Sequence, residues 1–246
     1  EKKGKSFWAK LEYDKKKRVS FKIKFDNSKI PEKTVRERKV FCPLCKESAK
    51  LKPYVMDEGR KGRIGEKIMA IVLENGSSLT VISPIKEHEI LAESVKESYK
   101  PNAELPKYTE TFKPINYGFS TYGDLFSNRQ LLAINTFSES IQNMHGVIER
   151  DAIKAGMVND KKPLQNEGKG ARAYADTVVT YLALQLGRSL NYWSTFNPWK
   201  NSYVINVFRR QALYMAWDFA EVNPFSGRSG SWSNGCNFMA RILKKN

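Results

Sequence analysis

Apolar and polar residues alternate strictly near the start of the chain. From residue 19 to residue 25 an apolar side chain occupies every second position, and serine or lysine fills the positions between them. A period of two predicts a half-buried strand whose lysines face water. Further strands are predicted at 67–73 and 79–82, and the Asn75-Gly76 pair between them is typical of a hairpin turn. The first third of the chain is therefore predicted to be β-rich.

Beyond residue 117 the apolar spacing changes to that of helices. Residues 128–150 carry apolar side chains every three or four positions, which predicts an amphipathic helix that Ser127 or Asn128 caps. Similar reasoning predicts further helices at 87–99, 171–190, 203–222 and 235–243.

The order of these elements predicts an α+β fold. Three prolines fall between residues 100 and 114, where apolar residues are few, and such a segment is typical of a linker. The expected organisation is a small basic β-rich module at 1–84, a helix and linker at 85–116, and a mainly helical domain at 117–246.

Charge is distributed unevenly along the 246 residues. The net charge is +16, and residues 1–67 hold 22 Lys and Arg against 10 Asp and Glu, a local net of +12. A concentrated positive field attracts polyanions, so nucleic acid is the predicted partner, with a plain solvated surface as the alternative. An anionic membrane surface is disfavoured because the basic segments are predicted as strands rather than as an amphipathic helix. Since the sequence shows no secretory signal and no apolar run near the roughly 20 residues that span a bilayer, a soluble cytoplasmic protein without a membrane partner is expected.

The motif Cys42-Pro43-Leu44-Cys45 lies inside the basic region. Two thiolates two residues apart on a tight turn can reach one metal ion, as they do in a zinc knuckle. Zinc needs four ligands, whereas Cys236, His88 and His145 are distant in sequence from the pair and from one another. Cys42 and Cys45 are therefore interpreted as half of a zinc ribbon, with zinc as a candidate cofactor. An unmetallated structural remnant and a redox pair remain open.

Residues 57–65 form a segment in which glycines interrupt a run of charges. Glycine lets backbone amides approach a phosphate closely, and cations supply the charge, so Arg60, Lys61 and Arg63 are predicted nucleic-acid contacts. The segment lacks the Gly-Lys-Ser/Thr ending of a nucleotide-binding loop. A solvated turn is the alternative.

Two other segments partly match motifs of amino-methylating enzymes. Residues 223–232 read NPFSGRSGSW, but the spacing of the glycines and the predicted preceding helix favour a structural turn over a cofactor loop, with Arg228 as a DNA contact. The second proline of a catalytic turn is missing there and at Asn197-Pro198-Trp199. Tyr192, Trp193, Phe196 and Trp199 form an aromatic cluster that is either a base-stacking surface or, as we favour, core. Two histidines offer little for acid–base chemistry, and no nucleophile triad is found.

Several groups of residues, taken in order, are similar to one known family. They are GRKGRIG at 59–65 with IMAIV at 68–72, YGDLF at 122–126 with RQLL at 129–132, YAD at 174–176 with YLAL at 181–184, and RQA at 210–212 with WDFA at 217–220 and NPFSG at 223–227. Together they resemble the large adenine-specific DNA methyltransferases that contain a zinc ribbon, a prokaryotic family often found near phage-defence genes.

The resemblance implies that the chain is the middle segment of such an enzyme. In the family, the S-adenosylmethionine loop and the first cysteine pair precede the matching region, and the catalytic Pro-Pro turn follows it. Cys42 and Cys45 then match the second zinc pair, with Lys46 where a glycine commonly stands. Arg129 joins the expected nucleic-acid contacts, and no catalytic or cofactor-binding residue is carried over.

The expected function is therefore to bind and position DNA within an S-adenosylmethionine-dependent adenine-specific methyltransferase of restriction-modification or phage-defence type. The expected partners are DNA and the remaining parts of the parent enzyme. Two alternatives stay open: a stand-alone, non-enzymatic nucleic-acid-binding or assembly module, and a self-contained methyltransferase that uses the loop at Asn223.

Overall fold

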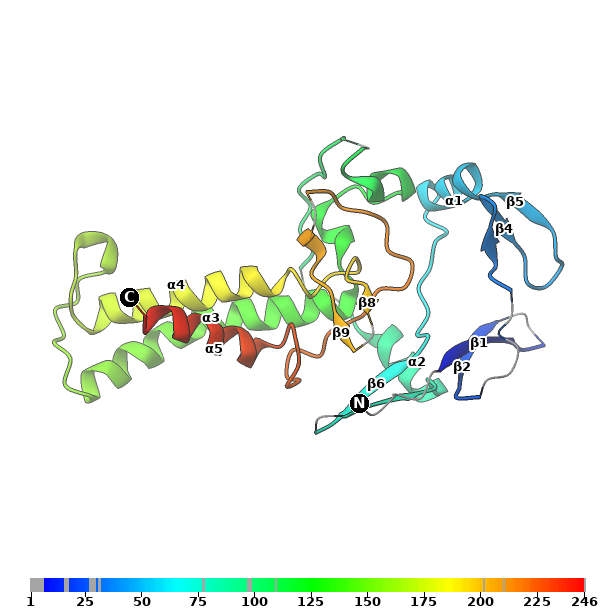
Figure 1. The fold of residues 1–246 in the computed structure, drawn as a ribbon. Helices are drawn as coiled ribbons and strands as arrows, with labels where there is room; N and C mark the ends of the chain where they lie inside the picture. The colour runs from blue at the N-terminus through cyan, green and yellow to red at the C-terminus, as the bar shows by residue number, and fades with distance from the viewer. Residues whose placement is uncertain are drawn as a thin grey trace. The chain divides into compact units, whose positions relative to one another are not determined.

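The computed structural model describes residues 7–15, 18–26, 30, 32–76, 78–96, 99–108, 110–200, 202–209 and 211–245. Over these residues the fold is α+β, as predicted, with small antiparallel sheets and five α-helices (Figure 1). The chain divides into two compact units. The first comprises Glu1–Val95 and Lys113–Ser120, and the second Lys96–Phe112 and Thr121–Asn246.

The first unit begins with a two-stranded antiparallel hairpin of β1 (Trp8–Tyr13) and β2 (Val19–Lys24). The alternation in β2 is confirmed, because Ile23 is buried while Lys22 is exposed. The backbone N–H of Ile23 donates to the Ser83 hydroxyl over 2.9 Å, so the hairpin is tied to a residue 60 positions further along.

A three-stranded sheet and a helix follow. In this sheet β4 (Lys39–Phe41) lies between β3 (Val35–Arg36) and β5 (Ser48–Lys50), and β5 leads directly into α1 (Leu51–Arg60). Buried Gly59 allows the end of α1 to pack on the 3-10 helix η1 (Lys113–Tyr117). A Cβ atom at Gly59 would lie 2.2 Å from the Tyr117 carbonyl oxygen, so only glycine fits.

The predicted hairpin around Asn75-Gly76 is confirmed. It consists of β6 (Ile71–Asn75) and β7 (Ser78–Ile82), with Gly76 at φ +57 in the turn; Ser77 lies outside the described residues. The first strand starts four residues later than predicted. Helix α2 (Lys86–Ser94) is shorter than the predicted 87–99 segment.

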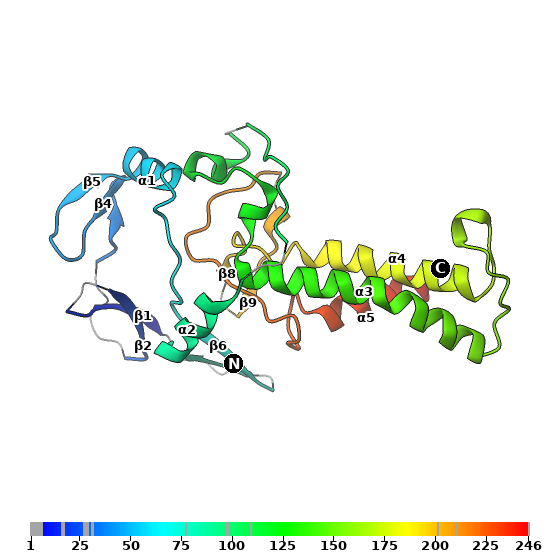
Figure 2. The same cartoon turned by 180° about the vertical axis from the view of Figure 1, so that it is seen from behind.

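Three helices dominate the second unit. The predictions at 128–150, 171–190 and 235–243 are confirmed as α3 (Asn128–Lys154), α4 (Ala171–Ser189) and α5 (Trp232–Leu243), which lie side by side in Figures 1 and 2. The predicted cap of α3 is Ser127, whose hydroxyl accepts from the Gln130 N–H while the Gln130 side chain accepts from the Ser127 N–H. Phe137 packs against Trp193 and Trp232, with ring centroids 5.3 and 4.7 Å apart.

The helix predicted at 203–222 is wrong. This segment contains strand β9 (Tyr203–Val204), paired with β8 (Trp199–Lys200), then the 3-10 helix η4 (Val207–Arg209) and irregular backbone. Its N–H groups bond to distant carbonyls instead of forming helical bonds. Val207 donates to the Asn191 carbonyl (2.8 Å), Leu213 to that of Thr111 (2.7 Å) and Ala220 to that of Asn197 (2.8 Å). These tertiary bonds override a spacing that suits a helix.

Candidate nucleic-acid interface and cysteine turn

The β1–β2 hairpin gathers positive charge on one face. Directly opposed residues of an antiparallel pair share a face, and the register opposes Lys10 to Lys22 and Trp8 to Lys24. We call Trp8, Lys10, Lys22 and Lys24 the basic hairpin face. The other face carries the apolar residues of the alternation, including buried Ile23.

Like charges lie opposite one another on the basic hairpin face. A directly opposed lysine pair is unfavourable by itself, and Glu12 relieves it by pairing with Lys10 over 3.1 Å. The pKa of Glu12 is lowered, first by the hydrogen bond from Lys10 and then by the charges of Lys10, Lys22 and Lys24. The lysines thus act together on an anion placed among them.

The predicted cations at 57–65 lie at the end of α1 and just beyond it. Arg60 ends the helix and is exposed, Lys61 pairs with Asp57 over 2.5 Å, and Arg63 makes a two-pronged pair with Glu58 at 2.5 and 2.7 Å. Exposed ion pairs of this kind contribute only about 0–1 kcal/mol, so a phosphate can compete for these side chains. Phosphate contact by the three residues stays a prediction.

Arg129 occupies the first turn of α3 and has a carboxylate partner. Its guanidinium donates to both carboxylate oxygens of Glu221 (2.9 and 2.7 Å), and the Ser127 hydroxyl donates to the same group over 2.6 Å. Arg129 therefore ties residue 221 to the start of α3. A phosphate at Arg129 would have to displace Glu221, and that contact also stays a prediction.

The NPFSG loop, residues 223–227, is a turn that hydrogen bonds hold in place. The Asn223 side-chain oxygen accepts from the Phe225 N–H over 3.0 Å, and the Trp193 ring nitrogen donates to the Gly230 carbonyl over 2.7 Å. The Asn234 amide, in the first turn of α5, donates to the carbonyls of Gly227 and Arg228. Arg228, one of the predicted DNA contacts, is therefore anchored to α5 through its backbone. Neither the expected helix nor a strand precedes the loop.

Asn197 is fully buried, and both ends of its amide are engaged. Its oxygen accepts from the backbone N–H and the hydroxyl of Ser194, both at 2.8 Å, while its nitrogen donates to the carbonyls of Asn191 (2.6 Å) and Ile205 (2.9 Å). An amide used in this way has a structural role and is not free to accept a substrate amine.

The cysteine motif forms the turn between β4 and β5. The pKa of the Cys42 thiol is lowered because the backbone N–H groups of Cys45 and Leu44, and then the Cys45 thiol, donate to its sulfur. Lys46 closes the turn at φ +65, a left-handed conformation that favours glycine, and donates its backbone N–H to the Cys42 carbonyl over 2.9 Å.

This turn fits half of a zinc site. Amide donation to a cysteine sulfur stabilises the thiolate that zinc binds. Among the described residues, however, no three His, Cys, Asp or Glu side chains gather in a way that could hold a metal ion. His88 instead accepts from the Ile85 N–H at the start of α2, and the His145 Nε2 lies 2.7 Å from an Asp176 oxygen.

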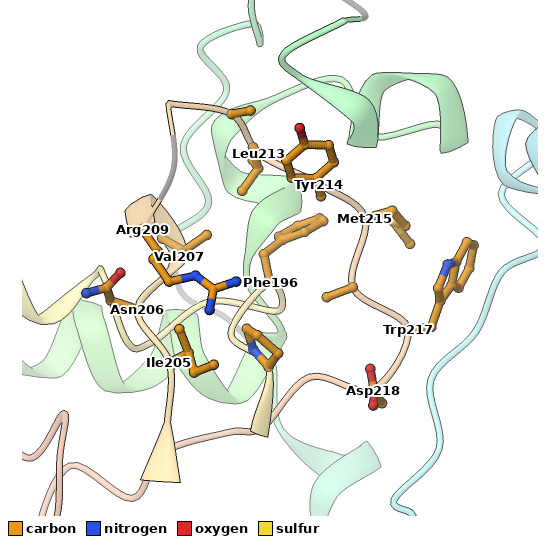
Figure 3. A pocket seen from close by; sticks show the side chains of 13 residues that line it. Phe196, Ile205, Asn206, Val207, Arg209, Leu213, Tyr214, Met215, Trp217 and Asp218 are labelled. Carbon is orange, nitrogen blue, oxygen red and sulfur yellow. The ribbon is translucent and has the colours of Figure 1, made fainter. Parts of the chain in front are cut away.

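The second unit contains a pocket that the sequence did not predict (Figure 3). It has a volume of about 220 Å³ and is lined by residues between 196 and 218. Phe196 and Leu213 are buried, whereas Tyr214 and Trp217 are 52% and 55% exposed. Trp193 and Phe196 of the aromatic cluster are thus core, as favoured above, whereas Tyr192 and Trp199 are half-buried. The aromatic side chains that are exposed enough to stack on a base, Tyr214 and Trp217, lie in the segment 203–222 that was predicted to be helical.

Comparisons with protein-family models, with curated proteins and with solved structures find no match. Over the described part of the chain, none of the helices is both long enough and apolar enough to cross a bilayer.

Proposed function

We propose that this chain binds and positions DNA as a segment of an S-adenosylmethionine-dependent adenine-specific DNA methyltransferase. The observation that carries the DNA-binding part is the basic hairpin face, where Lys10, Lys22 and Lys24 share one side of a two-stranded sheet. The hydrogen bond from Lys10, and then the charges of Lys10, Lys22 and Lys24, lower the pKa of Glu12, and the same charges would attract phosphate oxygens.

The chemistry of this face suits the DNA backbone more than the base edges. Lysine is a compact charge on a flexible stem, so it neutralises phosphate without the planar fork that reads guanine. Phosphate contacts set the orientation of a protein on the duplex and carry no sequence information by themselves. The proposed role of the hairpin is therefore to hold and orient DNA, with target choice made elsewhere.

The methyltransferase part of the proposal rests on the ordered resemblance of the segments between residues 59 and 227. Methyl transfer to the adenine amine requires the base to leave the duplex stack and enter a pocket. A segment that grips the flanking backbone would support that step. S-adenosylmethionine and the reacting groups are assigned to the remaining parts of the parent enzyme, whose setting we propose to be restriction-modification or phage defence.

Cys42 and Cys45 are proposed as two of the four ligands of a structural zinc ion. When bound, zinc would cross-link the turn between β4 and β5 to the polypeptide that supplies the other two ligands. Elemental analysis of the purified chain should find well under one zinc per molecule, because two thiols alone hold the metal weakly. Near one zinc per chain would show that further ligands lie within this sequence.

Duplex binding at a fixed low salt concentration tests the proposal. The triple variant K10Q/K22Q/K24Q should bind a 20-base-pair duplex roughly tenfold or more weakly, since three charge-assisted phosphate contacts are removed. The variant K154Q/K161Q/K162Q removes the same charge from exposed positions in the second unit and should retain most of the affinity. Equal losses in the two variants, or no duplex binding by the wild type, would overturn the proposal.

A stand-alone binding module is the second candidate function. It is favoured because the Asn197 amide and the NPFSG loop both have structural roles. The two segments that partly match methyltransferase motifs therefore have no catalytic role in this chain. Titration calorimetry with S-adenosylmethionine should give no heat under either candidate. Saturable heat would instead support a self-contained methyltransferase.

A further inference from the structure

The pocket in the second unit combines an apolar floor with an aromatic rim. Buried Phe196 and Leu213 form the floor, and exposed Tyr214 and Trp217 stand at the margin (Figure 3). Its volume, about 220 Å³, is below the range of about 300–1,000 Å³ that is usual for drug-sized ligands. The part of a ligand that enters the pocket is therefore small, on the scale of a single planar ring system.

One cation serves this pocket. Figure 3 shows the Arg209 guanidinium reaching into the space beside Phe196 and Ile205, while the Asn206 side chain points away from the other lining groups. Within the described residues Arg209 makes no ion pair, and the lining carboxylate of Asp218 is not within ion-pair distance of it. The Arg209 guanidinium is therefore available to bind an anionic group at the edge of the aromatic-lined pocket.

The pocket is held open by backbone bonds to other segments. The Leu213 N–H donates to the Thr111 carbonyl over 2.7 Å, and the Ile205 N–H donates to the Pro198 carbonyl over 3.0 Å. The buried Asn197 amide also holds the Ile205 carbonyl. Floor and wall are therefore fixed before a ligand arrives, which reduces the ordering cost of binding.

We propose that this pocket binds one nucleotide, with its unstacked base against the exposed Trp217 ring and its phosphate at Arg209. The proposal rests on the proposed function, because that function brings nucleic acid to the chain. Aromatic faces accept any base by stacking, and a guanidinium suits a phosphate. An unpaired position of a strand or a free nucleotide can supply this chemistry.

Two 12-nucleotide single strands of equal charge test the proposal, one with bases and one abasic throughout. The base-bearing strand should bind about 5- to 150-fold more tightly, the range for one stacked base. The W217A variant should lose this preference while its affinity for the abasic strand stays unchanged. The Y174A variant removes an aromatic of similar exposure on α4 and should keep the preference.

Adenosine monophosphate alone distinguishes the two sources of the nucleotide. If the mononucleotide competes at concentrations near those of the strand, the pocket is assigned to free nucleotides. If it competes only at far higher concentrations, the pocket is assigned to a strand. R209Q should weaken the binding of either ligand. Equal binding of the two strands by the wild type, with no binding of the mononucleotide, overturns the proposal. If duplex DNA still binds in that case, only the pocket assignment fails. If no nucleic acid binds at all, the proposed function fails with it.

Discussion

Replacing Asn197 with alanine should be among the most destabilising single changes in the second unit. The variant leaves the buried Ser194 N–H and the part-buried Ile205 carbonyl without the partner that the amide supplies. The Ser194 hydroxyl and the Asn191 carbonyl each lose one bond but keep another contact, from Phe196 N–H and Val207 N–H respectively. Two orphaned groups at about 1–3 kcal/mol each, plus two weakened ones, give an expected loss of about 3–4 kcal/mol.

The isosteric variant N197D separates hydrogen bonding from packing. Its carboxylate still accepts from Ser194 but presents an oxygen to the carbonyls of Asn191 and Ile205, where a donor is needed. Protonation restores one donor, so N197D should be less destabilised near pH 4 than near pH 7 when each is compared with the wild type. N223A removes an exposed amide with one hydrogen bond and should cost less than about 1 kcal/mol.

Urea unfolding measures these differences. Tryptophan emission is a suitable probe, because Trp193 is buried beside this network, and far-ultraviolet circular dichroism follows the three helices. A loss for N197A no larger than that for N223A would refute the structural role assigned to the amide, as would an N197D destabilisation that does not depend on pH.

Three other predictions concern stability. G235A should destabilise the protein by about 2 kcal/mol, because its Cβ atom would lie 1.8 Å from the side-chain nitrogen of buried Gln185. G187A, with open space around it, should instead stabilise the protein by about 0.5–1 kcal/mol, and melting temperatures that shift in the same direction for both variants would contradict this. The pKa of Asp176 is lowered by a backbone N–H and by a histidine, so its carboxylate stabilises the fold above the ordinary pKa of about 3.9 and loses this contribution as the pH falls through the lower pKa of the folded state. The difference in free energy of unfolding between the wild type and D176N, measured in urea, should therefore narrow below about pH 4. K46G should stabilise by about 1 kcal/mol in urea, because glycine adopts the left-handed backbone of this turn without strain; an unchanged midpoint would contradict this.

Local pattern was sufficient for the elements that local forces determine. The alternation in β2, the hairpin at Asn75-Gly76 and the Ser127 cap were all predicted because each depends on residues a few positions apart. The Cys42–Cys45 turn was predicted for the same reason, and Lys46 adopts the left-handed backbone that favours glycine at its end.

The segment around the pocket could not be predicted in this way. Its apolar spacing suits a helix, but its backbone is drawn to carbonyls at residues 111, 191 and 197, and no short-range pattern encodes those partners. The ion pairs of Lys61, Arg63 and Arg129 with nearby or distant carboxylates were missed for a related reason, since composition counts charges without placing their partners.

The salt dependence of duplex binding tests the DNA-gripping role of the basic hairpin face most directly. The logarithm of affinity should fall linearly with the logarithm of salt concentration, and each lost phosphate contact should reduce the slope by about 0.9. K10Q/K22Q/K24Q should therefore show a slope shallower than that of the wild type by roughly 2.7, while K154Q/K161Q/K162Q should match the wild type. Parallel lines for the wild type and the hairpin variant would contradict the proposal.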